Sequence, residues 1–181
     1  MQFARDTFYV ALRDALAAIN PARTITLDGQ VRPAVVSLEN EPVTVADPTA
    51  TVDPLTQATT RRPAVANAFY LEWGAVRAAA GFDASPRPLL AMDCAIAFCT
   101  AGSVEYAGVD RGREFARLAA ELLGMCAAGS ADKQDYTQTP PADLGSRILW
   151  TRPRFAAPQA IGAELQGSAA VTVLFFPEVN G

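Results

Sequence analysis

The chain has 181 residues, half of them apolar and 19% charged, which is the composition of a folded domain rather than of a disordered or membrane-spanning chain. At this length one hydrophobic core forms without metal or disulfide support, so we expect a single domain over 1–181. Nineteen acidic residues against fifteen basic ones give a formal charge of -4, which argues against the broad basic surface of a general nucleic-acid-binding protein. The absence of histidine removes the usual general base and most zinc ligand sets, and with them the common hydrolase and metalloenzyme classes.

The cysteines and the N-terminal segment indicate the compartment. Cys94, Cys99 and Cys126 are odd in number and show no CxxC spacing, so they predict neither a disulfide framework nor a zinc site. A reducing compartment fits such free thiols best. Charged residues interrupt the apolar pattern of 1–19, and no stretch reaches the roughly 20 apolar residues of a membrane span. We therefore expect neither export by a signal peptide nor a membrane anchor.

The first predicted elements are a helix and a hairpin. Apolar residues recur every three or four positions in 3–19, as on one side of an amphipathic helix, and Asn20-Pro21 ends this pattern. Segments 23–27 and 32–39 have the β-branched and alternating residues of strands, and they flank Asp28-Gly29, a pair typical of tight turns.

The middle of the chain predicts a loop followed by two strands. Residues 41–63 are rich in Pro, Thr, Asp and Ala, so they predict a long exposed loop. For 65–80 both strand and helix remain open, because the apolar positions match both spacings, and we favour the strand. The clearest strand is 89–100. One of its faces has mostly small side chains, and the other has large apolar ones suited to a core, namely Leu90, Met92, Cys94, Ile96 and Phe98.

The C-terminal part predicts a second helix and two further strands. Asp110 is a candidate N-cap for a helix that ends near 124–129. Polar residues and Pro140-Pro141 predict a second extended loop over 127–147, and Pro153 confines the strand 148–155 to a sheet edge or a bulge. Residues 165–175 alternate as the last strand. The predicted fold class is α+β, a mostly antiparallel sheet with two helices packed on one face and long extended loops.

The sequence shows no clear catalytic, cofactor or metal site. Asp93 and Glu72 lie on predicted strands and would form a carboxylate pair for acid-base catalysis if those strands paired in register, but isolated surface carboxylates are far commoner. Cys94 and Cys99 point to opposite faces of a regular strand, so we expect packing roles for them. Neither glycine-rich nucleotide motif is present. The expectation is no catalytic residue, no cofactor and no metal.

Two small basic spots are candidate partner contacts. Arg61 and Arg62 lie in the predicted loop 41–63, and arginines flank Pro153 on the predicted edge strand. Most exposed arginine pairs are simply solvated. Because loops and sheet edges are common sites of subunit contact, we expect partner binding at Arg61, Arg62 and Pro153.

The order of these elements resembles a known family. A helix with FYVALRDAL (8–16) leads into a hairpin that ends in RPAVVSLE (32–39), a strand pair follows, and a helix with FARLAAELL (115–123) precedes two closing strands. This order resembles the tail-terminator and minor tail proteins of long-tailed bacteriophages and related tail-like particles. These are small α/β proteins that form a ring at the head-proximal end of the tail tube. The resemblance is one of pattern over most of the chain, and it assigns no functional residue.

The resemblance implies a structural subunit that forms a ring with itself, hexameric in this family, and contacts tail-tube and neck proteins. DNA would be only passing cargo, and an acidic protein would not retain its phosphates. The subunit would assemble in the host cytoplasm and then reside in the virion or tail-like particle. The alternative is a small-ligand-binding protein or a histidine-free enzyme that uses Asp93, Glu72 or a pocket under the second helix. A deep pocket with converging polar groups would favour that alternative, and flat surfaces flanked by loops would favour assembly.

Overall fold

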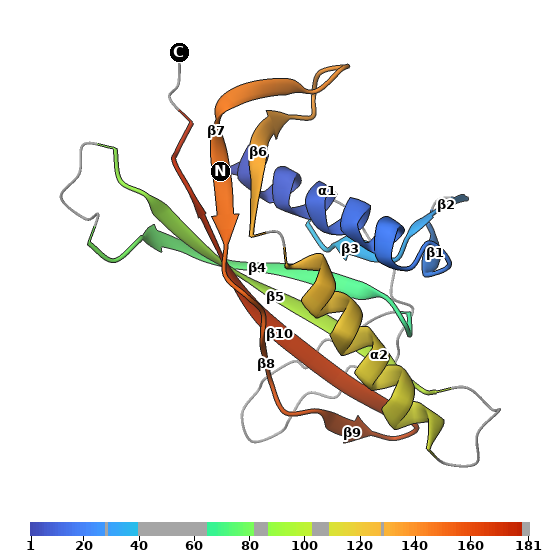
Figure 1. Ribbon diagram of the computed structural model, residues 1–181. Helices are drawn as coiled ribbons and strands as arrows, with labels where there is room; N and C mark the ends of the chain where they lie inside the picture. Colours follow the sequence, from blue (N-terminus) through green and yellow to red (C-terminus); the bar gives the residue numbers. More distant parts are fainter. Residues whose placement is uncertain (28, 40–64, 82–86, 103–108, 128, 179–181) are drawn as a thin grey trace.

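The computed structural model describes residues 1–27, 29–39, 65–81, 87–102, 109–127 and 129–178. Within these ranges the chain forms two helices and ten strands, and both helices lie against one face of a curled sheet (Figure 1). None of the described helices is long and apolar enough to cross a membrane. In chain order the elements are α1 (Gln2–Ile19), β1 (Thr24–Leu27), β2 (Gln30–Pro33), β3 (Val35–Ser37), β4 (Phe69–Ala78), β5 (Leu90–Thr100), α2 (Asp110–Met125), β6 (Ser130–Asp135), β7 (Ala142–Trp150), β8 (Arg154–Phe155), β9 (Gln159–Ile161) and β10 (Glu164–Phe175).

Eight strands form the main sheet, in the order β3-β4-β5-β10-β7-β6, with β8 and β9 also paired to β10. Because β5 pairs with β10 over the length of β10, strands β7, β8 and β9 follow one another along the other side of β10. Strands β1 and β2 form a small second sheet. The α+β class is confirmed, but the main sheet is mixed, since β3 runs parallel to β4. The long connection between these two strands lets the chain return in the same direction.

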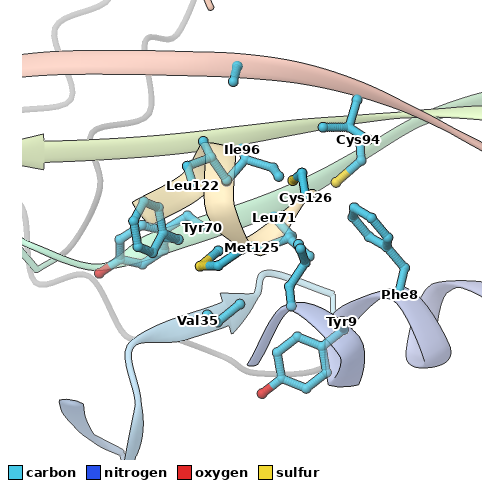
Figure 2. Packing of buried hydrophobic residues seen from close by; sticks show 14 of the residues in the cluster. Phe8, Tyr9, Val35, Tyr70, Leu71, Cys94, Ile96, Leu122, Met125 and Cys126 are labelled. Carbon is cyan, nitrogen blue, oxygen red and sulfur yellow. The ribbon is translucent and has the colours of Figure 1, made fainter. Parts of the chain in front are cut away.

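The core lies between the helices and the sheet (Figure 2). Most of the apolar stripe of each helix is buried, although Ile19 and Leu123 are exposed, and the large apolar face of β5 is shielded from water except at Leu90, which is partly buried. Residues 65–80 contain the strand β4, so the choice of a strand is confirmed. The largest buried side chains of the helices and β5 are Phe8, Leu12, Leu16, Leu118, Leu122, Met125, Met92, Ile96 and Phe98.

Helix α2 approaches the sheet closely at Gly167 of β10. A Cβ atom at this position would lie 2.6 Å from Cζ of Phe115 and 2.9 Å from Cζ of Phe98, distances that real Cβ contacts do not reach. The rings of Phe98 and Phe115 pack at a centroid distance of 5.2 Å. The aromatic ring of α2 therefore rests on the backbone of β10, an approach that only glycine permits.

A buried ionic network joins the two helices. Arg23 lies between α1 and β1, and its guanidinium donates from Nε to Glu121 and from Nη2 to Oε1 of Glu114 at 2.8 Å. Its Nη1 donates to the carbonyl of Asn67 at 3.3 Å, and Asn20 donates to Glu121 at 2.7 Å. The side chains of Arg23 and Glu121 are only 8% and 7% exposed. Each of these charges is buried and is stable only when it is paired with the other. The pair therefore holds α1, α2 and the segment before β1 in one arrangement.

The expected loop over 127–147 is wrong, because these residues form most of the β6–β7 hairpin. The polar run of β6 belongs to a strand at the border of the sheet, where Asp132 reaches water while Lys133 and Asp135 are buried with polar partners. Pro140 lies between the two strands, so it removes no hydrogen bond from their pairing. Polarity and proline were thus signs of a sheet edge and a turn, and not of a long loop.

Two buried polar side chains, Thr7 of α1 and Lys133 of β6, connect strand β6 to its neighbours. The pairing of β6 with β7 shifts register between Asp132 and Gln134, and the backbone N–H of Gln134 donates to Oγ1 of Thr7 in α1 at 3.1 Å. Lys133 is 2% exposed and donates from Nζ to the carbonyl of Phe176 at 2.9 Å. The irregularity thus directs a lysine inward and lets the helix satisfy a strand N–H that the ladder leaves free.

Two expectations on element ends also need correction. Residues 148–155 are not one edge strand. Strand β7 ends at Trp150 and lies between β10 and β6, and β8 begins at Arg154 and pairs with β10 further along the same side. Pro153 lies in the break between them, where no ladder hydrogen bond is needed. Asp110 is the first helical residue rather than the N-cap, which is Val109, so its carboxylate acts on the helix dipole from the first turn.

Several expectations fall on residues outside the described ranges. These are the long exposed loop 41–63 and, within it, the contact residues Arg61 and Arg62. Asp28 of the predicted turn also lies outside them. A hairpin is present as β1–β2, but the second strand expected over 32–39 is divided, because β2 ends at Pro33 and β3 belongs to the main sheet.

We predict that Arg23→Met lowers the free energy of unfolding by about 3–5 kcal/mol, because it leaves the Glu121 carboxylate buried without its cation. Urea denaturation followed by circular dichroism measures the change. In the double variant Arg23→Met with Glu121→Met most of the lost stability should return, since the unpaired carboxylate at position 121 is then no longer buried. A double variant no more stable than Arg23→Met would contradict this account. Arg13→Met, which removes a more exposed arginine paired with Asp14, should cost under about 1 kcal/mol.

Candidate functional site

The face of the sheet that points away from the helices is the main candidate surface, and we call it the outer face. On β5 and β10 it consists of the residues that alternate with the core positions. Ala95 pairs with Ala170, and both are exposed. The small-residue face predicted for 89–100 is therefore confirmed at its centre. Towards the end of β5 this face is covered, since Cys99 is fully buried and neighbouring Tyr70 is 2% exposed.

A polar cluster around Asp93 stands on the outer face. Arg77 of β4 donates from Nη1 to Oδ2 of Asp93 at 2.7 Å and from Nη2 to Oδ1 at 3.2 Å. Thr172 of β10 donates from Oγ1 to Oδ1 of Asp93 at 2.7 Å. Gly74 of β4 lies close against Asp93, because a Cβ at this position would lie only 3.3 Å from the carbonyl oxygen of Asp93. The cluster thus connects three adjacent strands across the outer face.

These contacts lower the pKa of the Asp93 carboxyl. The largest cause is the hydrogen bond from Arg77, followed by that from Thr172, and the positive charge of Arg154 acts in the same direction. Asp93 is half-exposed, so solvent weakens each of these interactions. The carboxylate is ionised at neutral pH and its oxygens are already bonded, which is the state of a structural ion pair.

The hypothesis of a catalytic pair of Asp93 and Glu72 is not supported by the geometry. Glu72 lies opposite Ala95, so the two carboxylates share a face but occupy successive rows. The Asp93 carboxylate is bound to Arg77 and Thr172, neither of which raises its pKa as a general acid requires. Among the described residues, no group of three or more His, Cys, Asp or Glu side chains could hold a metal ion.

The three cysteines are free and buried. Cys94 lies on the core side of β5 and Cys99 on the other side, as their spacing predicts. Cys94 and Cys126 lie close together in the core (Figure 2). Burial raises the pKa of the Cys126 thiol to about 12, and burial likewise raises the pKa of Cys94 far above the ordinary value. These thiols are therefore protonated packing groups and poor nucleophiles.

Of the predicted contact residues the structure describes Pro153, which makes none of the hydrogen bonds of the Asp93 cluster. Pro153 is buried, while its neighbours Arg152 and Arg154 are exposed on the border of the sheet. Arg77 and Thr172 could not be identified from the sequence as partners of Asp93, because their contact depends on the pairing of three strands. The signal in the sequence is a polar residue at an outward-facing position of each strand, and in β10 Thr172 shares that face with other polar residues.

Comparison with known proteins assigns no family. No protein-family model and no curated protein matches the chain. One solved structure that is similar to it is described as "Virion of native gene transfer agent (GTA) particle"; it has 14% sequence identity and a TM-score of 0.36, over 96% of this chain and 94% of that one. A TM-score this low does not establish a common fold, so this likeness carries no argument for function.

We predict that the carboxyl of Asp93 titrates below the ordinary range of aspartate, and that Thr172→Val raises its pKa by removing one hydrogen bond. Carbon-detected NMR of the Asp side chains measures both values. The folded-state pKa is lowered, so the stability that Asp93 contributes is present above the ordinary aspartate pKa and is lost as pH falls through the lowered value. Because the site is exposed, Asp93→Asn should cost under about 1 kcal/mol at neutral pH and nothing once the carboxyl is protonated. An Asp93 carboxyl that titrates normally would refute this.

We also predict that no thiol reacts rapidly with a disulfide reagent in the folded protein, and that three react after unfolding without reductant. The reason is that Cys94, Cys99 and Cys126 are each at most 1% exposed. Ellman titration in buffer and in guanidinium chloride counts the groups. One reactive group after unfolding would mean that a disulfide had formed, and rapid reaction in buffer would mean that the core is open.

Proposed function

We propose that this protein is a structural subunit of a phage-like particle, and that it forms a ring that caps the tail tube and joins it to the head or neck. The observation that carries the proposal is the open centre of the outer face, where Ala95 and Ala170 leave an exposed surface of small side chains on the two longest strands. Such a surface can approach another protein layer closely. It offers no converging polar groups for a small substrate, because the charged side chains at its centre are already bonded to one another.

Two further features support assembly. Part of the order of elements that carries the resemblance to tail-terminator and minor tail proteins occurs here, namely α1, the β1–β2 hairpin, the pair β4 and β5, and α2, although five strands rather than two follow α2. The resemblance also suggests a hexamer. The net charge of -4 suits a ring around a DNA channel, since an acidic lining repels phosphates and lets DNA pass.

The test is to add the purified protein to the tail-tube subunit of its own particle during tube polymerisation and to image the products by electron microscopy. We expect tubes that carry a ring at one end and stop growing. A ring needs a heterologous contact between two different patches of each subunit, so the subunits should be related by rotation about the tube axis. The same protein unfolded before addition is the control. Tubes that elongate unchanged and never carry the protein would disprove the proposed function.

A further inference from the structure

One row of exposed side chains crosses the outer face from one border of the sheet to the other. Glu72 of β4 pairs with Ala95 of β5, Ala95 pairs with Ala170 of β10, and Ala170 pairs with Arg154 of β8. All four residues are exposed. The row therefore has a negative end, two alanines and a positive end, and we call it the Glu72–Arg154 row.

Both ends of this row lie at unpaired borders of the sheet. Strand β3 pairs with β4 only as far as Leu71, so no described strand pairs with the outer side of β4 from Glu72 onward. At the other border, no described strand pairs with the outer side of β8. Unpaired strand borders present backbone N–H and C=O groups that can bind a further strand.

The side chains beside the two charges also suit a contact. Phe155 follows Arg154 and is 42% exposed, and the next residues, Ala156 and Ala157, are exposed as well. On the opposite border, the β4 irregularity that follows Glu72 contains exposed Gly74 and Ala75. One border thus presents an exposed aromatic ring beside a positive charge, and the other presents small residues beside a negative charge.

We infer that these two borders bind each other in neighbouring copies of this chain, with Arg154 of one copy beside Glu72 of the next. This inference rests on the proposed ring and names its subunit contact. The two patches are different, so the contact is heterologous and can close into a ring. Their opposite charges and their positions at opposite borders of one sheet make a second copy the fitting occupant.

Strand direction agrees with this arrangement. Successive strands from β4 through β5 and β10 to β8 are antiparallel, so β8 runs opposite to β4. A second copy that continues the sheet in the same orientation therefore places its β4 antiparallel to β8 of the first. An opposite-charge pair directly across an antiparallel border favours that register.

Charges within one copy leave both ends of the row available. Arg154 lies near enough to Asp93 to lower the pKa of that carboxyl, but the Asp93 oxygens are already bonded to Arg77 and Thr172. Glu72 and Arg154 are separated by two whole strands, so they do not neutralise each other within one copy.

Charge reversal tests the contact. Sedimentation of the intact protein up to about 1 mM measures self-association, and we expect Glu72→Arg and Arg154→Glu each to weaken it about tenfold, because attraction becomes repulsion. An equimolar mixture of the two variants should associate like the natural protein, since every contact then joins opposite charges. Arg147→Glu, an exposed arginine of β7 paired with Asp132, is the control and should change little. Reversals without effect, or a mixture that fails to recover, would overturn the inference.

Cross-linking decides the case if association is too weak to sediment. The double variant Glu72→Cys with Arg154→Cys, treated with a short bismaleimide, should give a ladder of multimers. Each single variant should stay monomeric, because it places a thiol on only one side of the contact and the natural cysteines are buried. A double variant that also stays monomeric overturns the contact. If Arg154→Glu still caps tubes normally, the contact is wrong and the proposed function stands; if multimers form but tubes remain uncapped, the contact stands and the proposed function is wrong.

Discussion

Arg23 ties together parts of the chain that no regular pairing connects. Its guanidinium binds Glu121 and Glu114 of α2 and the carbonyl of Asn67, which precedes β4. Its own carbonyl accepts the N–H of Ala34, beside β3. One residue thus fixes the junction of both helices, the second sheet and the first strands of the main sheet. A buried charge tolerates few alternative arrangements, so this position contributes specificity of packing more than net stability.

The helices and strands that could be predicted from the sequence are those with one buried side, because apolar residues then recur at regular intervals along the element. Strand β5 and both helices have such a period because one side of each faces the core. Strands β6 and β7 could not be predicted, because β6 is at a border of the sheet and its side chains are polar even where they are buried. The inward side chain of Lys133 gives no apolar signal, although it is as buried as a core leucine.

The candidate site depends on how neighbouring strands pair, which the residue pattern of a single strand does not show. The alternation in β5 predicts that Asp93 and Ala95 share a face with small residues, and that is confirmed. Which residues of β4 and β10 meet them is set by register, and β4 shifts register between Trp73 and Val76. Neither Arg77 as the partner of Asp93 nor the alignment of Glu72 with Arg154 follows from spacing within a segment.

Helix α2 is held at two places along its length. Near its start Phe115 rests on the backbone at Gly167, and about a turn and a half further on Glu121 is held by Arg23. A helix supported at one point can tilt about it, but two supports on different elements prevent tilting and sliding alike. Because α2 is fixed at these two points, a force that pulls on β10 is transmitted to the helix and from the helix to the N-terminal elements. Force applied to one part of this domain should therefore load it as a whole.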